Sequence, residues 1–194
     1  MYVNYSVATW LRPARRIGSY SDSAENSRYM PEVGDTAPGF SAVVAGGNTY
    51  NDIDTVTLTE ILETGPVVLA FYPAAFTSGC TEEMCTFRDN MSAFAEVNAQ
   101  VYGISVDLPF AQNIWIQEES LNFPMISDWD HGITEAFDVV LPKMYDAVDV
   151  AQRSVFVIDT EQTIRYAWIR DGDNPDFGKL VAEVHDAVVA IADE

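Results

Sequence analysis

The two cysteines of this chain, Cys80 and Cys85, lie five positions apart, and Cys80 is the residue best placed to do chemistry. An apolar run at residues 66–72 precedes them and has the β-branched and aromatic composition of a buried strand. Pro73 ends this run, and apolar residues at helical spacing follow from Met84 onward, so Cys80 is expected in the first turn of a helix. The unpaired N–H groups and the dipole of a helix start stabilise a thiolate, the reactive form of cysteine. The sequence therefore predicts a nucleophilic thiol at a strand–helix junction.

The spacing of Pro73, Thr77 and Cys80 is Pro-x3-Thr-x2-Cys, and in this motif the chain resembles the peroxiredoxins of the AhpC/TSA superfamily. The residues around the motif are most similar to the bacterioferritin-comigratory (PrxQ) branch, which often carries a second cysteine five positions after the first. The segment Tyr166-Ala167-Trp168 is also similar to the one-cysteine AhpE-like branch. The resemblance covers the chain from about Met30 to its C-terminus.

This resemblance implies a peroxidase site around Cys80, which would attack one oxygen of a peroxide. Thr77 can offer a hydroxyl to the peroxide, and Pro73 shapes the turn and shields the site from water. Arg153 is assigned to the site only because of the resemblance. It would add a positive charge that stabilises the thiolate and the departing oxygen. Without the surrounding motif, a single cysteine at a strand–helix junction is more often a small buried apolar residue than a nucleophile.

Two charged residues near the motif have alternative interpretations. Glu83 either orients the site by a hydrogen bond or is simply an acid favoured by the dipole at a helix start, and the second reading is slightly preferred. Arg88 pairs either with a carboxylate of the active-site network or with any other of the thirty acidic residues. We treat both as supporting residues.

Cys85 either resolves the oxidised Cys80 or packs inward as an apolar residue. In an intact helix the two side chains point about 140° apart and their Cα atoms lie roughly 8 Å from each other, beyond the reach of a disulfide. An intramolecular disulfide therefore requires the first turns of the helix to unwind. The PrxQ-like spacing favours this disulfide over resolution by an external thiol.

The composition excludes several classes of protein. The chain has 194 residues, enough for one α/β domain, with 30 acidic and 10 basic residues and a formal charge of −20. This charge argues against a nucleic-acid or anionic-membrane partner, and the scarcity of lysine resembles proteins of salt-loving archaea. Two cysteines five apart suit a reducing cytoplasm. No metal site or cofactor is expected, because His131 and His185 lie far apart in the sequence.

The N-terminal segment differs in kind from the rest. Residues 1–29 hold four basic and two acidic residues, which leaves a charge of −22 on residues 30–194. Arg15-Arg16 is not followed by an apolar stretch of the kind a signal peptide needs. We interpret residues 1–29 as a disordered extension or a mis-assigned start, and an ordered role in subunit contacts is the minority alternative.

Residues 30–194 alternate between strand and helix patterns, which predicts a thioredoxin-like domain: a central mixed sheet flanked by helices, with an N-terminal β extension. No membrane-spanning run or internal repeat is seen. Strands are expected at residues 41–44, 56–58, 67–72, 101–106, 124–127, 154–158 and 163–168, and helices at 58–63, 82–98, 109–120, 133–137 and 177–192.

Together these features predict a thiol-dependent peroxidase acting on hydrogen peroxide or organic hydroperoxides. Cys80 would become a sulfenic acid, Cys85 would condense with it, and a thioredoxin- or glutaredoxin-like reductant would reopen the disulfide. The alternatives are a one-cysteine peroxidase resolved by an external thiol, and a thioredoxin-fold disulfide exchanger or redox sensor. A monomer and a homodimer both stay open, and the pocket walls are sought among Phe76, Trp115 and Phe123.

Overall fold

The structure is a computed structural model that describes residues 30–192, so the expected extension at residues 1–29 lies outside the described part of the chain. Nine strands and five helices follow one another within it. The strands are β1 (Ser41–Ala45), β2 (Ile53–Thr57), β3 (Val67–Phe71), β4 (Gln100–Ser105), β5 (Met125–Ser127), β6 (Val140–Met144), β7 (Val148–Ala151), β8 (Ser154–Ile158) and β9 (Ile164–Ile169). The helices are α1 (Leu58–Leu62), α2 (Ser78–Glu96), α3 (Pro109–Glu118), α4 (Gly132–Ala136) and α5 (Phe177–Ala192).

Seven strands form one mixed sheet in the order β2-β1-β5-β4-β3-β8-β9. β3, β4 and β5 run parallel, β8 and β1 pair antiparallel with β3 and β5, and the outer strands β9 and β2 pair antiparallel with β8 and β1. The β1–β2 hairpin is the N-terminal β extension predicted from the sequence. β3 is wholly buried because it lies inside the sheet and is covered on both faces, which explains its continuous apolar sequence.

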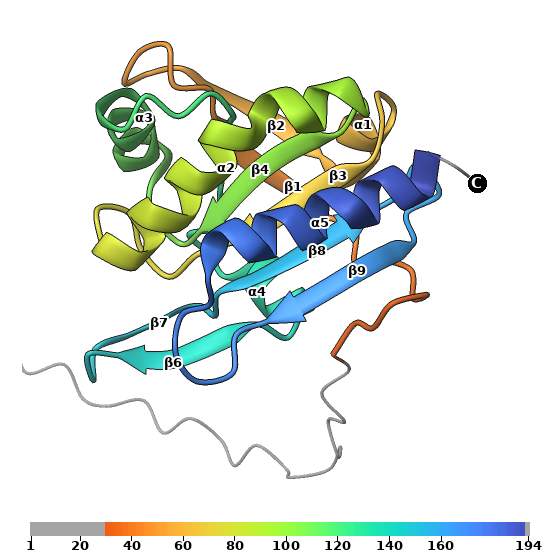
Figure 1. Ribbon diagram of the computed structural model, residues 1–194. Coiled ribbons are helices and arrows are strands. Elements are labelled where there is room, and N and C mark those ends of the chain that lie inside the picture. The colour runs from red at the N-terminus through yellow and green to blue at the C-terminus, as the bar shows by residue number, and fades with distance from the viewer. Residues whose placement is uncertain (1–29, 193–194) are drawn as a thin grey trace, which may run out of the picture.

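Helices cover both faces of this sheet, and Figure 1 shows α2 and α5 lying side by side on one of them. Val68, Ala70 and Tyr72 point to this face and pack with apolar residues of α2, α3 and α5. Val67, Leu69 and Phe71 alternate to the opposite face, where α1 and α4 cover them. The predicted layered α/β arrangement is confirmed.

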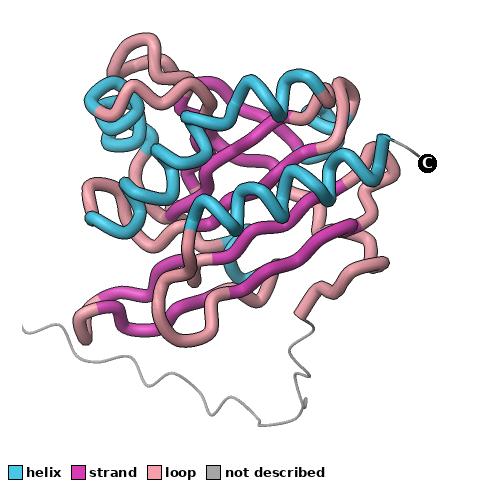
Figure 2. Tube along the Cα trace, viewed as in Figure 1, coloured by secondary structure: helices cyan, strands magenta, loops and turns pink. Residues whose placement is uncertain are grey.

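Two elements differ from the expectation. The strands β6 and β7 were not predicted, because Pro142, Lys143, Asp146 and Asp149 interrupt any alternating pattern there. They form a separate hairpin that projects beyond one end of the central sheet (Figure 2). Helix α2 begins at Ser78 rather than at the expected residue 82, since its small and polar first turn carries no apolar periodicity.

Within residues 30–192, no helix combines the length and the apolar character that crossing a membrane requires.

Candidate active site

The register of the central sheet brings Arg153 to Cys80. β3 and β8 pair antiparallel with Phe71 opposite Ser154, so the residue just before β8 lies beside the loop that leaves β3. That residue is Arg153, and the loop leads directly into α2, where Cys80 is the third residue. The Arg153 Nη2 atom donates a hydrogen bond to the Cys80 Sγ atom over 3.3 Å. Both side chains are buried, with exposed fractions of 3 % and 1 %.

The loop between β3 and α2 is held in a fixed shape. Phe76 has a positive φ of 62°, and the backbone N–H of Ala75 donates to the Asp107 carboxylate over 2.8 Å. The Thr77 hydroxyl donates to the carbonyl oxygen of Ala74 over 2.9 Å. Because its hydrogen is used in this bond, the Thr77 oxygen has lone pairs left to accept a hydrogen bond from a ligand.

Pro73, Thr77, Cys80 and Arg153 line one cavity of about 310 Å³. Its size is at the lower end of the range for small-molecule sites. Four of the residues singled out from the sequence therefore share one pocket, although Arg153 is 73 positions from Cys80.

Glu83 lies behind Arg153, is fully buried, and forms an ion pair with it through Oε2 and Nη1. Burial raises the pKa of Glu83 to about 7, although Arg153 and Arg170 act in the opposite direction. Burial lowers the pKa of Arg153, but Glu83 and Cys80 raise it by more, so the guanidinium stays charged. Glu83 thus contacts Arg153 in the site and is not merely an acid favoured by the dipole at a helix start.

Two residues of this site were missed by sequence reasoning. The Asn174 Oδ1 atom accepts hydrogen bonds from Arg153 Nε and from Arg170 Nη1, each over 3.3 Å. Arg170 follows β9, and its backbone N–H donates to the Arg153 carbonyl over 2.9 Å. Both residues line the pocket. The only available signal was the position of Arg170 at the end of a strand in the predicted hairpin.

The remaining wall of the pocket comes from the unpredicted hairpin. Leu141 and Met144 of β6, together with Tyr145, line the cavity, and Tyr145 has an exposed fraction of 87 %. The expected wall residues are elsewhere: Trp115 and Phe123 are buried in the core, and Phe76 is exposed beside Trp115 with ring centroids 6.1 Å apart.

Cys85 lies on α2 away from this pocket, and both cysteines are free thiols. Its Sγ atom lies 3.4 Å from Arg88 Nη1 and 3.8 Å from Glu119 Oε2. Burial raises the pKa of Cys85; Glu119 and Asp89 add to this, and Arg88 opposes it. Arg88 pairs with Asp89 over 2.8 Å, and neither residue lines the Cys80 pocket, so its partner is an acid outside that pocket.

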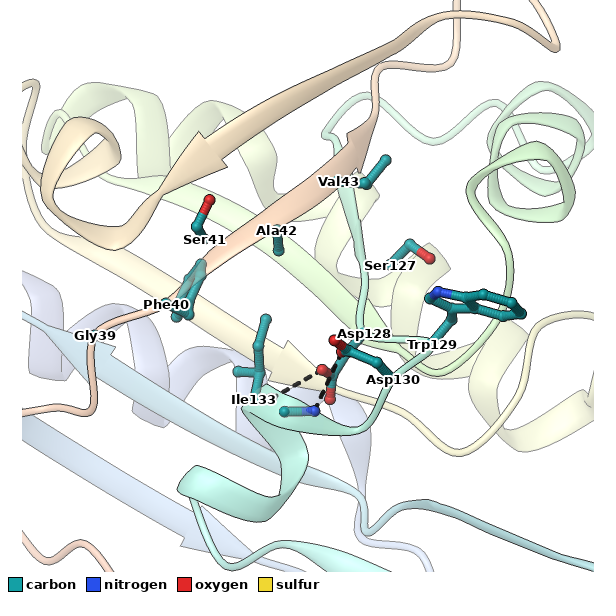
Figure 3. A pocket seen from close by; sticks show the side chains of 11 residues that line it. Gly39, Phe40, Ser41, Ala42, Val43, Ser127, Asp128, Trp129, Asp130 and Ile133 are labelled. Atoms are coloured by element: carbon teal, nitrogen blue, oxygen red, sulfur yellow. Dashed lines mark hydrogen bonds between the residues drawn. The ribbon is translucent and has the colours of Figure 1, made fainter.

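A second cavity, of about 380 Å³, lies between β1 and the start of α4 (Figure 3). One of its acids, Asp128, is buried and accepts hydrogen bonds from the N–H groups of Ile133 and Thr134 over 2.8 and 2.7 Å. Figure 3 shows the carboxylates of Asp128 and Asp130 turned toward this helix start. These acids hold α4 in place, and the cavity contains neither cysteine.

No three histidine, cysteine or carboxylate side chains of residues 30–192 come together in a way that could hold a metal ion.

Comparison with known proteins gives one family. The model of the AhpC/TSA family matches residues 33–167. The 2-Cys peroxiredoxin BAS1 of Hordeum vulgare is 31 % identical over 161 residues, which cover 79 % of this chain and 72 % of that protein. The crystal structure of peroxidoxin BcpB from Mycobacterium tuberculosis superposes with a TM-score of 0.72 at 30 % identity, covering 83 % of this chain and 98 % of the other.

A further solved structure, peroxiredoxin Q of Xanthomonas campestris, superposes with a TM-score of 0.67 at 26 % identity. The superposition covers 79 % of this chain and 91 % of the peroxiredoxin Q chain. These neighbours confirm the predicted thioredoxin-like fold.

Proposed function

We propose that in this chain, which belongs to the AhpC/TSA family and is a thiol-dependent peroxidase, Cys80 is the peroxidatic cysteine and Cys85 the resolving cysteine. The observation that carries the first role is the contact between Arg153 Nη2 and Cys80 Sγ, two residues that line the pocket. A buried guanidinium beside a sulfur at a helix start favours the thiolate form, and it faces the position where negative charge develops on a peroxide.

In the first step the Cys80 thiolate attacks one oxygen of the peroxide, and the O–O bond breaks. A sulfenic acid forms on Cys80, and the second oxygen leaves as water or an alcohol once it takes up a proton. Thr77 accepts a hydrogen bond from the peroxide O–H, because its own hydrogen is bound to Ala74. Arg153 stabilises the departing oxygen.

In the second step the Cys85 sulfur attacks the sulfur of the Cys80 sulfenic acid. The S–S bond forms, the S–O bond breaks, and the oxygen leaves as water. The two cysteines occupy successive turns of α2, so this step requires the first part of the helix to unwind. A thioredoxin- or glutaredoxin-like dithiol then reduces the disulfide by thiol–disulfide exchange and becomes oxidised itself.

The substrate we propose is hydrogen peroxide or a small organic hydroperoxide. The cavity of about 310 Å³ has room for more than the two oxygens of hydrogen peroxide, and the apolar side chains Leu141 and Met144 form one side of it. These side chains suit the alkyl part of an organic hydroperoxide.

Steady-state turnover with a thioredoxin system tests this proposal. We expect Cys80→Ser to abolish peroxide consumption and Cys85→Ser to abolish turnover with a protein dithiol while leaving one rapid turnover intact. Full turnover by Cys85→Ser would support the one-cysteine alternative. Reaction of Cys80 with peroxide no faster than a free thiol would support a disulfide exchanger or sensor.

A further inference from the structure

Hydrogen bonds connect the Cys85 region of α2 to the end of α3, a helix whose unwinding the proposed cycle does not require. Arg88 lies one turn after Cys85 on α2, and its Nη1 atom donates to the backbone carbonyl of Glu119 over 2.6 Å. Glu119 follows the last residue of α3, where helix carbonyls lack intrahelical partners and carry partial negative charge. The same Nη1 atom lies 3.4 Å from the Cys85 Sγ atom.

The Glu119 side chain completes the connection. Its Oε2 atom lies 3.8 Å from the Cys85 Sγ atom and accepts the thiol hydrogen. Asn122, just beyond α3, donates from Nδ2 to the Arg88 carbonyl over 3.3 Å. One guanidinium, one carboxylate and one amide therefore join the Cys85 turn of α2 to the end of α3.

The peroxide reaction changes the surroundings of Cys80 but not those of Cys85. When the Cys80 thiolate becomes a neutral sulfenic acid, its charge attraction to Arg153 weakens. The contacts of Cys85 with Arg88 and Glu119 contain no atom that reacts in the first step, so they persist until Cys85 itself reacts. They form a barrier to helix unwinding that oxidation of Cys80 does not lower.

We propose that Arg88 and Glu119 form a latch that holds Cys85 against the end of α3, and that opening of this latch controls how fast Cys85 attacks the Cys80 sulfenic acid. The proposal rests on the proposed function, since it takes Cys85 as the resolving thiol. Arg88 and Glu119 act through Cys85 and are positioning residues.

The latch has a chemical consequence at high peroxide concentration. A sulfenic acid that waits for Cys85 meets a second peroxide, whose O–O bond breaks as one oxygen adds to the sulfur and the other leaves as water or an alcohol. Cys80 then becomes a sulfinic acid, a more oxidised state that thiols do not reverse. A tighter latch therefore increases the fraction of Cys80 lost to this side reaction.

The experiment is a single-turnover reaction of the reduced full-length protein with hydrogen peroxide, quenched with an alkylating agent and analysed by intact mass. The ratio of the disulfide-forming rate to the sulfenic-acid-forming rate is compared between variants. We expect Arg88→Ala to raise this ratio by about tenfold, the factor that corresponds to one lost charge-assisted hydrogen bond. The sulfinic fraction at excess peroxide should fall accordingly.

A second variant tests the latch through pH. The charged groups that face Cys85 are Arg88 and Asp89 from α2 and Glu119 from α3. Because Glu119 raises the pKa of Cys85, Glu119→Gln should move the pH profile of the disulfide-forming step to lower pH. Glu118→Gln removes the same charge from the neighbouring exposed residue and is the matched control, for which we expect the wild-type profile.

The outcomes separate the two proposals. If wild type forms the disulfide but Arg88→Ala leaves the ratio unchanged or lowers it, the latch is wrong and the proposed function stands. A Glu119→Gln profile that coincides with wild type and Glu118→Gln also overturns the latch. If wild type forms no disulfide at all, the resolving role of Cys85 fails and the latch fails with it. If Arg88→Ala does not fold, the comparison of the Glu119→Gln and Glu118→Gln pH profiles with that of wild type tests the latch by itself.

Discussion

The Arg153 guanidinium contacts the Cys80 sulfur over 3.3 Å, because the pairing of Phe71 with Ser154 aligns the ends of β3 and β8. The sheet register thus fixes the distance between the cation and the thiol. Both residues are buried, so the charge interaction is screened less than it would be at the surface.

Arg153→Gln should slow the reaction of Cys80 with hydrogen peroxide by roughly 100- to 1,000-fold, the usual cost of losing a group that stabilises developing negative charge. The measurement is the second-order rate constant of the first step by stopped-flow mixing. Arg165→Gln is the control, since Arg165 lies on β9 in an ion pair with Asp159 outside the pocket. A rate within a few-fold of wild type for Arg153→Gln would contradict the assigned role.

Thr77→Val should slow the same step by about tenfold, because the valine removes the oxygen that accepts from the peroxide. Thr77→Ser keeps that oxygen and should retain most of the rate. The second-order rate constants of both variants, measured with hydrogen peroxide, check this. Equal rates for the two variants would show that the hydroxyl has no part in the reaction.

Gly79→Ala should disturb Arg153 through Asn174. A Cβ atom at residue 79 would lie 2.6 Å from the Asn174 Nδ2 atom, so the amide that accepts from Arg153 Nε must move. We expect the first-step rate to fall by about fivefold, the effect of one lost hydrogen bond, and Asn174→Ala to have the same effect. The double variant should be no slower than either single one, and additive losses would exclude this shared route.

The stability of the reduced protein should depend on pH through Glu83. Burial raises the pKa of this carboxyl from 4.5 to about 7 in the folded state, so the folded protein binds one more proton than the unfolded chain between these values. The free energy of unfolding contributed by Glu83 is therefore highest below pH 4.5, falls as the pH rises to about 7, and is constant above it.

Glu83→Gln should remove this slope, because glutamine does not titrate. Denaturant unfolding of wild type and variant at a series of pH values between 4.5 and 8 measures it. Parallel curves for the two proteins would show that Glu83 does not carry the dependence.

Elements with a clear local pattern could be predicted from the sequence, and elements whose local pattern is interrupted could not. The buried strand β3 and the helix after it were predictable because their apolar patterns are local. The β6–β7 hairpin was not, since Pro142 and Lys143 interrupt the alternating pattern and its register is irregular between Leu141 and Met144.

The same division holds within the site. Cys80 and Thr77 share one short motif, whereas Arg153 could be named only by resemblance, because its place depends on strand register. Arg170 and Asn174 lie in or beside a polar turn after β9 whose residue types are ordinary for a loop. Only the fold shows that this turn closes over Cys80 and Arg153.

The most direct test of the account is the intact mass and free-thiol content of wild type and Cys85→Ser after one equivalent of hydrogen peroxide, with a sulfenic-acid trap present and in molar salt. We predict that wild type loses two hydrogens and both thiols, while Cys85→Ser is trapped as a sulfenic acid on Cys80. Trapping of wild type at Cys80, with Cys85 still a free thiol, would contradict the two-cysteine cycle.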